Sequence, residues 1–148
     1  MWIGNEITQS QNLSESFIRE FQIIVNWRRI SMKQNLPEDF IREFQHDVAW
    51  IWISAHQRLS EKLIEEFQDK VHWTWLCVSH DISEYLMRKF SDRLNWNMVS
   101  QYQILSENFI RDFQNKVNWK KITRHKNLSE IFLGEFKDKL EFKNIVFQ

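Results

Sequence analysis

Hydrophobic positions recur along this chain with a fixed period of 23 residues. Phenylalanine returns at one position of the period, at Phe21, Phe44, Phe67, Phe90, Phe113 and Phe136. Tryptophan returns at another, at Trp27, Trp50, Trp73, Trp96 and Trp119, and Phe142 takes the sixth place. A fixed period of this size predicts an array of stacked repeats.

Each repeat begins with a pattern typical of an amphipathic helix, which we call helix A. The repeats start at Leu13, Leu36, Leu59, Ile82, Leu105 and Leu128, with no insertion between them. In the first repeat Phe17, Ile18, Phe21 and Val25 have helical spacing, and helix A is expected to run to about Asn26. Its other face is charged, with favourable i,i+4 pairs at Glu15/Arg19, Glu38/Arg42 and Glu107/Arg111.

The first residue of helix A has two interpretations. Ser14 can cap the helix, together with a hydrophobic staple. Alternatively Asn12 is the cap and Glu15 completes a capping box. Pro37, which replaces this serine in the second repeat, fits the second interpretation because proline suits a first helical turn.

A second and shorter helix, helix B, is expected to start at Asn26, which can cap it. Trp27, Ile30, Ser31 and Gln34 then lie on one face, and the small Ser31 lets a neighbouring helix approach. A helix of about eight residues is too short to be stable alone, so neighbouring repeats must hold it. Stacking is also what covers the apolar faces of both helices.

The pattern therefore predicts an all-α fold, an α-solenoid of six 23-residue two-helix repeats over residues 13–148. Residues 2–12 look like a trailing helix B, so residues 1–12 are expected to form an N-terminal half-repeat cap. Trp73 and Phe67 occupy the recurrent aromatic positions of a central repeat, and we expect both to be fully buried. The two glycines and one proline of the chain agree with helices joined by tight turns.

The repeat resembles tandem "LSExFIREFxDKVxWxxIS" repeats in uncharacterised proteins of large DNA viruses and related mobile elements. The resemblance covers nearly the whole chain and implies a helical-repeat fold. It implies no activity and no catalytic residues. The third repeat departs from the pattern, with Leu76 and Cys77 where Ile-Ser is expected.

Composition limits the partners and the compartment. The 20 basic and 20 acidic residues of this 148-residue chain balance, so no global charge attracts nucleic acid or an anionic membrane. No apolar run approaches the ~18 residues of a membrane span, and the N-terminal "MWIGNEITQSQ" does not read as a signal peptide. The only cysteine, Cys77, cannot form an internal disulfide, which suits the cytoplasm or another reducing compartment.

Positions that vary between repeats are free to contact solvent or a partner. The third, sixth and seventh residues of helix B share a face and form a ladder across stacked repeats. The residues expected to bind a partner are Trp52, His56, Trp75, Met98 and Tyr102, flanked by Arg28, Arg29, Lys120, Lys121 and Arg124. An aromatic centre with a charged rim is typical of a protein-binding surface.

We therefore expect a non-enzymatic, protein-binding scaffold. Three alternatives stay open. The tryptophans of the ladder can serve only to cover gaps between repeats, and the basic residues can be plain solvated side chains. The same residues can bind single-stranded nucleic acid, with Lys and Arg on phosphates and aromatic rings on bases. The chain can also be a structural spacer that associates end to end.

No catalytic, cofactor-binding or metal-binding site is expected. His72, Cys77, His80 and Asp81 are the nearest approach to a metal site. On one helix, however, the two histidines would lie ~12 Å apart, too far to share an ion. A Cys–His nucleophile pair lacks a third group to orient it.

Overall fold

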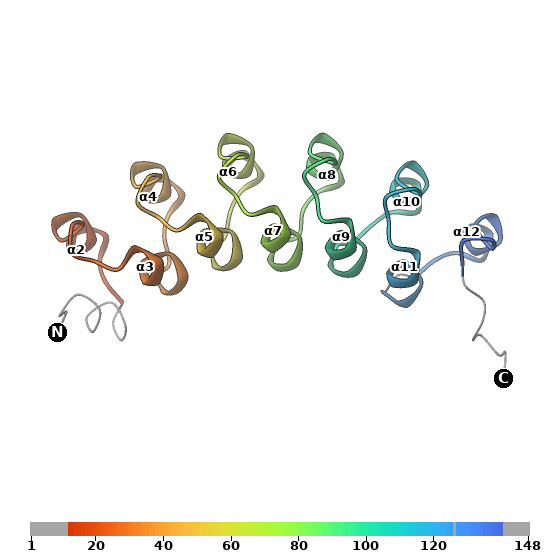
Figure 1. Ribbon diagram of the computed structural model, residues 1–148, viewed down its shortest axis with the longest axis horizontal. Coiled ribbons are helices and arrows are strands. Elements are labelled where there is room, and N and C mark those ends of the chain that lie inside the picture. Colours follow the sequence, from red (N-terminus) through yellow and green to blue (C-terminus); the bar gives the residue numbers. More distant parts are fainter. Residues whose placement is uncertain (1–11, 126, 141–148) are drawn as a thin grey trace. The chain divides into compact units, whose positions relative to one another are not determined.

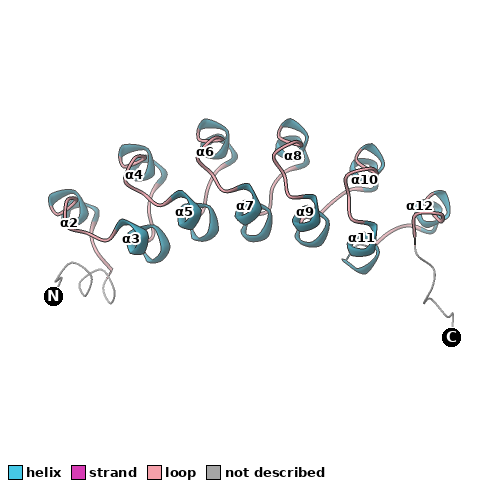
Figure 2. Cartoon of the chain, in the orientation of Figure 1, coloured by secondary structure: helices cyan, strands magenta, loops and turns pink. Residues whose placement is uncertain are grey.

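The computed structural model describes residues 12–125 and 127–140, and in these ranges it contains helices and no strand (Figure 2). The helices are α2 (Glu15–Glu20), α3 (Trp27–Lys33), α4 (Glu38–Glu43), α5 (Trp50–His56), α6 (Glu61–Glu66), α7 (Trp73–Ser79), α8 (Glu84–Lys89), α9 (Trp96–Tyr102), α10 (Glu107–Asp112), α11 (Trp119–His125) and α12 (Glu130–Glu135). The predicted all-α solenoid is confirmed. The half-repeat cap and the helix B of the sixth repeat fall outside the described residues, apart from Asn12.

The chain forms two compact units, the first ending at Ser79 and the second beginning at His80. Both are built by the same rule: the A helices, with even numbers, form one layer and the B helices, with odd numbers, form the other (Figure 1). In the first unit α3 packs against α5 and α5 against α7, and in the second unit α9 packs against α11. The B helices are thus the closely packed layer.

Helix A begins at the serine, which settles the choice between the two caps. Ser14 accepts a hydrogen bond from the N–H of Phe17, and Ser60 does the same for Leu63. Pro37 occupies the cap position itself, without a side-chain cap, in the extended conformation that its ring favours.

The prediction that helix A continues to about Asn26 is wrong. The helix ends at Glu20, and Phe21 is its C-cap. The next residues form a tight turn, in which the N–H groups of Ile24 and Val25 both donate to the Phe21 carbonyl. This early turn buries Val25 and leaves Asn26 free to cap α3, where its side chain accepts from the N–H of Arg29.

Burial of the helix A stripe is nearly complete in the middle repeats. Phe40 and Ile41 on α4 and Leu63 and Ile64 on α6 are almost inaccessible to solvent. Phe67 is buried, as predicted. At about 25 cal/mol per Å² of apolar surface, each such side chain contributes about 2 kcal/mol to folding.

Buried glutamine side chains tie each B helix to the one before it. Gln57 is only 4% exposed. Its Nε2 donates to the carbonyls of Ser31 and Gln34, at 2.9 and 2.7 Å, and its Oε1 accepts from the N–H of Leu36 at 3.0 Å. One side chain therefore satisfies three backbone groups at the junction of the first and second repeats, which would otherwise be buried without partners.

The same contact recurs in the second unit. Gln103 is buried, its Nε2 donates to the His80 carbonyl at 2.7 Å and its Oε1 accepts from the N–H of Ile82 at 2.8 Å. In the first repeat Gln34 accepts from the N–H of Leu13 at 2.9 Å. At each of these positions the glutamine side chain bonds backbone groups at a junction between repeats.

Buried serines of helix B make a second contact between repeats. Ser31 Oγ donates to the Trp27 carbonyl of its own helix and accepts from the N–H of Ala49, the cap of the next B helix. Ser54 and Ser100 act alike on His72 and Asn118. A small residue at this position was expected to allow close approach, and the structure adds a hydrogen-bonding role.

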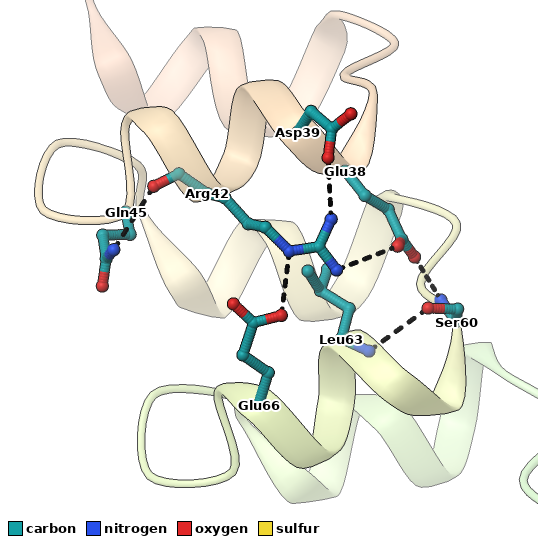
Figure 3. A network of polar contacts seen from close by, with 7 residues as sticks. All are labelled: Glu38, Asp39, Arg42, Gln45, Ser60, Leu63 and Glu66. Atoms are coloured by element: carbon teal, nitrogen blue, oxygen red, sulfur yellow. Dashed lines mark hydrogen bonds and ion pairs between the residues drawn. The ribbon is translucent and has the colours of Figure 1, made fainter.

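Charged side chains connect the A helices on the opposite side of the repeats (Figure 3). Arg42 on α4 contacts Asp39 and Glu38 of its own helix and reaches Glu66 on α6 at 2.8 Å. Glu38 also accepts from the N–H of Ser60. The predicted i,i+4 pairs are present, and each arginine additionally bridges to the next repeat.

These contacts shift the carboxylates toward their charged form. At Glu38, burial raises the pKa, but hydrogen bonds from Ser60 and Arg42 outweigh it and hold the pKa below its ordinary value. Glu107 receives the equivalent hydrogen bond from the N–H of Ser129, and this lowers its pKa. Protonation of the carboxylate at this repeat position would therefore weaken a contact between consecutive repeats.

We expect Gln57→Ala to lower the free energy of unfolding by about 2–4 kcal/mol, because it leaves three buried backbone groups without partners. Gln22, which is exposed and donates only within its own repeat, is the matched control. Gln22→Ala should cost less than about 0.5 kcal/mol. Urea denaturation followed by circular dichroism measures both, and equal losses would contradict the role given to Gln57.

Acid should destabilise the protein through Glu107. Because its folded pKa lies below its unfolded pKa, its contribution is complete above about pH 5 and is lost as pH falls through the folded pKa. In Glu107→Gln, stability should therefore fall less steeply below about pH 5 than in the wild type. Denaturation midpoints from pH 7 to 3 measure this.

Glu130→Gln is the control for this experiment. Glu130 occupies the same repeat position and makes no hydrogen bond or ion pair with any residue that the structure describes. Its substitution removes a carboxylate at the same repeat position without removing the contact to Ser129. A Glu107→Gln profile that matches the wild type would show that the Ser129 contact does not stabilise the fold.

Candidate functional site

The predicted ladder lies on the outer face of the B helices, and in the first unit part of it is one cluster. The ring of Trp52 on α5 stacks on His56 one turn later, with centroids 5.6 Å apart and planes 14° apart. The Arg28 guanidinium of α3 lies over the same ring, 5.1 Å from its centroid. Trp52 is half-buried as a result, and the cluster links two successive repeats.

Trp75 on the next B helix is more accessible. It occupies the same repeat position as Trp52 but is 40% exposed. The residue that corresponds to Arg28 for this ring is Ile51 on α5, itself 43% exposed. The α5 and α7 helices pack together, so two exposed apolar side chains lie on adjacent B helices.

The remaining predicted residues belong to the second unit. Met98 on α9 is half-buried, and Tyr102 at the end of this helix is 47% exposed. On α11, Lys120 and Arg124 are exposed, and Lys121 donates to the Gln101 side chain of α9 at 2.6 Å. Each unit thus carries its own group of aromatic or apolar and basic residues.

Arg29 on α3 is half-buried, and Lys33 at the end of this helix is exposed. The exposed apolar residues Ile51 and Trp75 lie on the next two B helices, α5 and α7. In the first unit the basic side chains therefore stand on α3 and the most exposed aromatic side chain stands on α7.

Two residues of this face were not among those that the sequence pattern predicted to bind a partner. Ile51 is the only aliphatic residue at a position where the other repeats have Arg28, Thr74, Asn97 and Lys120. That departure from the polar pattern could have identified it. Gln101 is the sixth residue of its helix B, so it belongs to the ladder, but it was not among the residues expected to bind a partner. Its hydrogen bond to Lys121 holds that lysine against α9.

The recurrent tryptophans are not fully buried, so the prediction for Trp73 is wrong. Trp73, like Trp50, is half-buried. The reason is a polar requirement: the indole Nε1 of Trp50 donates to the Gln45 carbonyl at 2.9 Å, five residues back. The ring packs against Phe67 of the next repeat at 4.8 Å, and this position at the seam between the layers leaves one ring edge accessible.

Charge is distributed unevenly between the two kinds of helix. None of the five described B helices contains an aspartate or glutamate. Their basic residues are Arg28, Arg29, Lys33, Lys120, Lys121 and Arg124. Each described A helix, in contrast, begins with a glutamate. Although the net charge of the chain is zero, the described B helices of each unit therefore carry an excess of basic residues.

The described residues offer little for metal binding, thiol chemistry or membrane insertion. Within 12–125 and 127–140, no group of three or more histidines, cysteines or carboxylates is placed to hold a metal ion. Cys77 is buried in the small-residue position of α7. None of the described helices has the length and apolar character needed to cross a membrane.

Comparisons with protein-family models, curated proteins and solved structures find no match to this chain. The resemblance to the viral and mobile-element repeats therefore stays a prediction.

Substitutions two residues apart on α5 test the assignment of faces. Trp50→Ala removes the ring packed on Phe67 and the bond to Gln45, and should cost about 3 kcal/mol of stability. Trp52→Ala removes a surface cluster and should cost about 1 kcal/mol. Chemical denaturation measures both, and an equal or reversed order would show that Trp52 is the structural residue of the pair.

Proposed function

We propose that this chain is a non-enzymatic scaffold that binds a protein partner through the outer face of its B helices. The exposure of both Trp75 and Ile51, on adjacent B helices, is the observation that carries the proposal. Large aromatic side chains at 40% exposure are costly to leave in water, and in contacts between proteins they supply most of the binding energy. The neighbouring basic residues would orient the partner and accelerate its approach.

Support for the alternative, binding of single-stranded nucleic acid, comes from the five described B helices, none of which contains a carboxylate side chain. Phosphates would then contact Arg28 and Arg29, and bases would stack on Trp52 and Trp75. Against it, the ring of Trp52 is already occupied by His56 and Arg28, so little of it is available to a base. Protein binding accounts better for the aliphatic Ile51.

We also propose a reducing compartment, on the ground that the single cysteine is a buried thiol at a packing position. Cys77 there takes the place of the serines that hydrogen-bond successive B helices in other repeats. Oxidation would place a larger polar group in a tightly packed position.

A selection of random linear peptides displayed on yeast, against the immobilised full chain, tests the proposal. Peptides that bind should lose affinity for Trp75→Ala by about 2 kcal/mol or more, because this ring is expected to be a hot spot. Tyr85→Ala is the matched control, since Tyr85 is an exposed aromatic residue on the A helix α8. Fluorescence anisotropy of synthetic peptides gives the affinities.

Two outcomes would contradict the proposal. If no peptide that depends on Trp75 is enriched, while oligo(dT) binds at micromolar or tighter affinity with steep salt dependence, nucleic-acid binding replaces it. If neither binds and the chain forms filaments as its concentration rises, the end-to-end spacer replaces it.

A further inference from the structure

Within the described part of the first unit, the basic side chains of the B face (the outer face of the B helices) make no ion pair with a carboxylate. Arg29 and Lys33 make no ion pair with any residue in the described part of the chain, and neither does Arg28, whose guanidinium lies over Trp52. Arginines on the A helices differ, since Arg19 binds Glu15 and Glu43 and Arg42 binds three carboxylates. Among the B helices of this unit, the arginine and lysine residues are thus all on α3.

The position of these charges within α3 is locally unfavourable. Arg28 and Arg29 stand in the first turn, where the helix dipole disfavours positive charge, and α3 has no acidic residue there to offset them. Lys120 and Lys121 stand in the first turn of α11 in the second unit. Residues that break a local rule without a compensating contact are expected where function requires them.

The order of the residues along the B face indicates which chemical groups the partner carries and how far apart they are. Basic side chains on α3 are followed by the Trp52 cluster on α5 and by the exposed Trp75 on α7. Helices that pack side by side lie ~8–10 Å apart, so about 16–20 Å separate α3 from α7. An extended chain at ~3.3 Å per residue covers that distance in about five or six residues.

We infer that the occupant of the B face of the first unit is an acidic segment of a protein. Its carboxylates contact Arg28, Arg29 and Lys33, and an apolar side chain about five or six residues away covers Trp75 and Ile51. The inference rests on the proposed function and gives it a ligand class. Carboxylates complete the ion pairs that the A helices make internally and the B helices lack.

The composition of the peptides selected on yeast tests this inference separately from the proposed function. Peptides that depend on Trp75 should be enriched in aspartate and glutamate, with an apolar or aromatic residue at the expected spacing. In Arg29→Ser/Lys33→Ser their affinity should fall by about tenfold or more at low salt, and the loss should shrink at about 0.5 M salt. Lys33→Ser alone, at an exposed position, should give part of this loss.

Lys62→Ser/Lys137→Ser is the matched control, because it removes the same charge from exposed positions outside the B helices. Its affinity should stay within about twofold of the wild type. If peptides depend on Trp75 but show no excess of acidic residues and bind Arg29→Ser/Lys33→Ser normally, the inference fails while the proposed function stands. If no Trp75-dependent peptide is enriched, both fail.

Binding of oligo(dT) tests whether the basic side chains prefer the phosphates of a nucleic acid to the carboxylates of a protein segment. Weak binding that changes little when Trp75 is replaced supports the acidic protein segment. Oligo(dT) that binds more tightly than the selected peptides and loses its affinity in Arg29→Ser/Lys33→Ser overturns the inference, because phosphate is then the preferred partner of these side chains.

Discussion

Helices of six or seven residues cannot satisfy their own backbones. The first N–H groups and last C=O groups of any helix have no partner within it, and in helices this short they are most of the backbone. The side chain of Gln57 resolves this for the turn between α3 and α4 by bonding three backbone groups at once. Stacking is therefore a condition for the helices to exist, and the outer face of the B helices becomes rigid as a consequence.

The repeat itself was predictable because the aromatic and aliphatic residues recur with an unvarying period. The short B helix was predictable too, since Asn26 is a strong cap. The end of helix A was not, because the helical spacing of Phe21 and Val25 is kept while the backbone between them tightens into a turn. The half-burial of Trp50 and Trp73 depends on the indole N–H, a requirement that a hydrophobic pattern does not reveal.

At the candidate site, the sequence pattern placed the ladder residues at equivalent positions of the B helices but could not rank their exposure. Trp52 and Trp75 hold the same repeat position, yet one is covered and the other exposed. Trp52 is covered by His56 of its own helix and by Arg28 of the preceding repeat, whereas the corresponding positions for Trp75 hold Ser79 and Ile51. Exposure at a repeated position therefore depends on the residue four positions later and on the residue 24 positions earlier, which a pattern of single positions does not reveal.

The glutamine contacts carry a consequence for how such a chain changes in length. Because Gln57 and Gln103 bond backbone atoms, they place no demand on which side chains the neighbouring repeat contributes. An in-frame duplication or deletion of one whole repeat in the gene would leave these bonds intact, whereas a gain or loss of part of a repeat would break them. Selection can thus lengthen or shorten the outer face of the B helices by whole repeats and vary its residues independently of these backbone contacts.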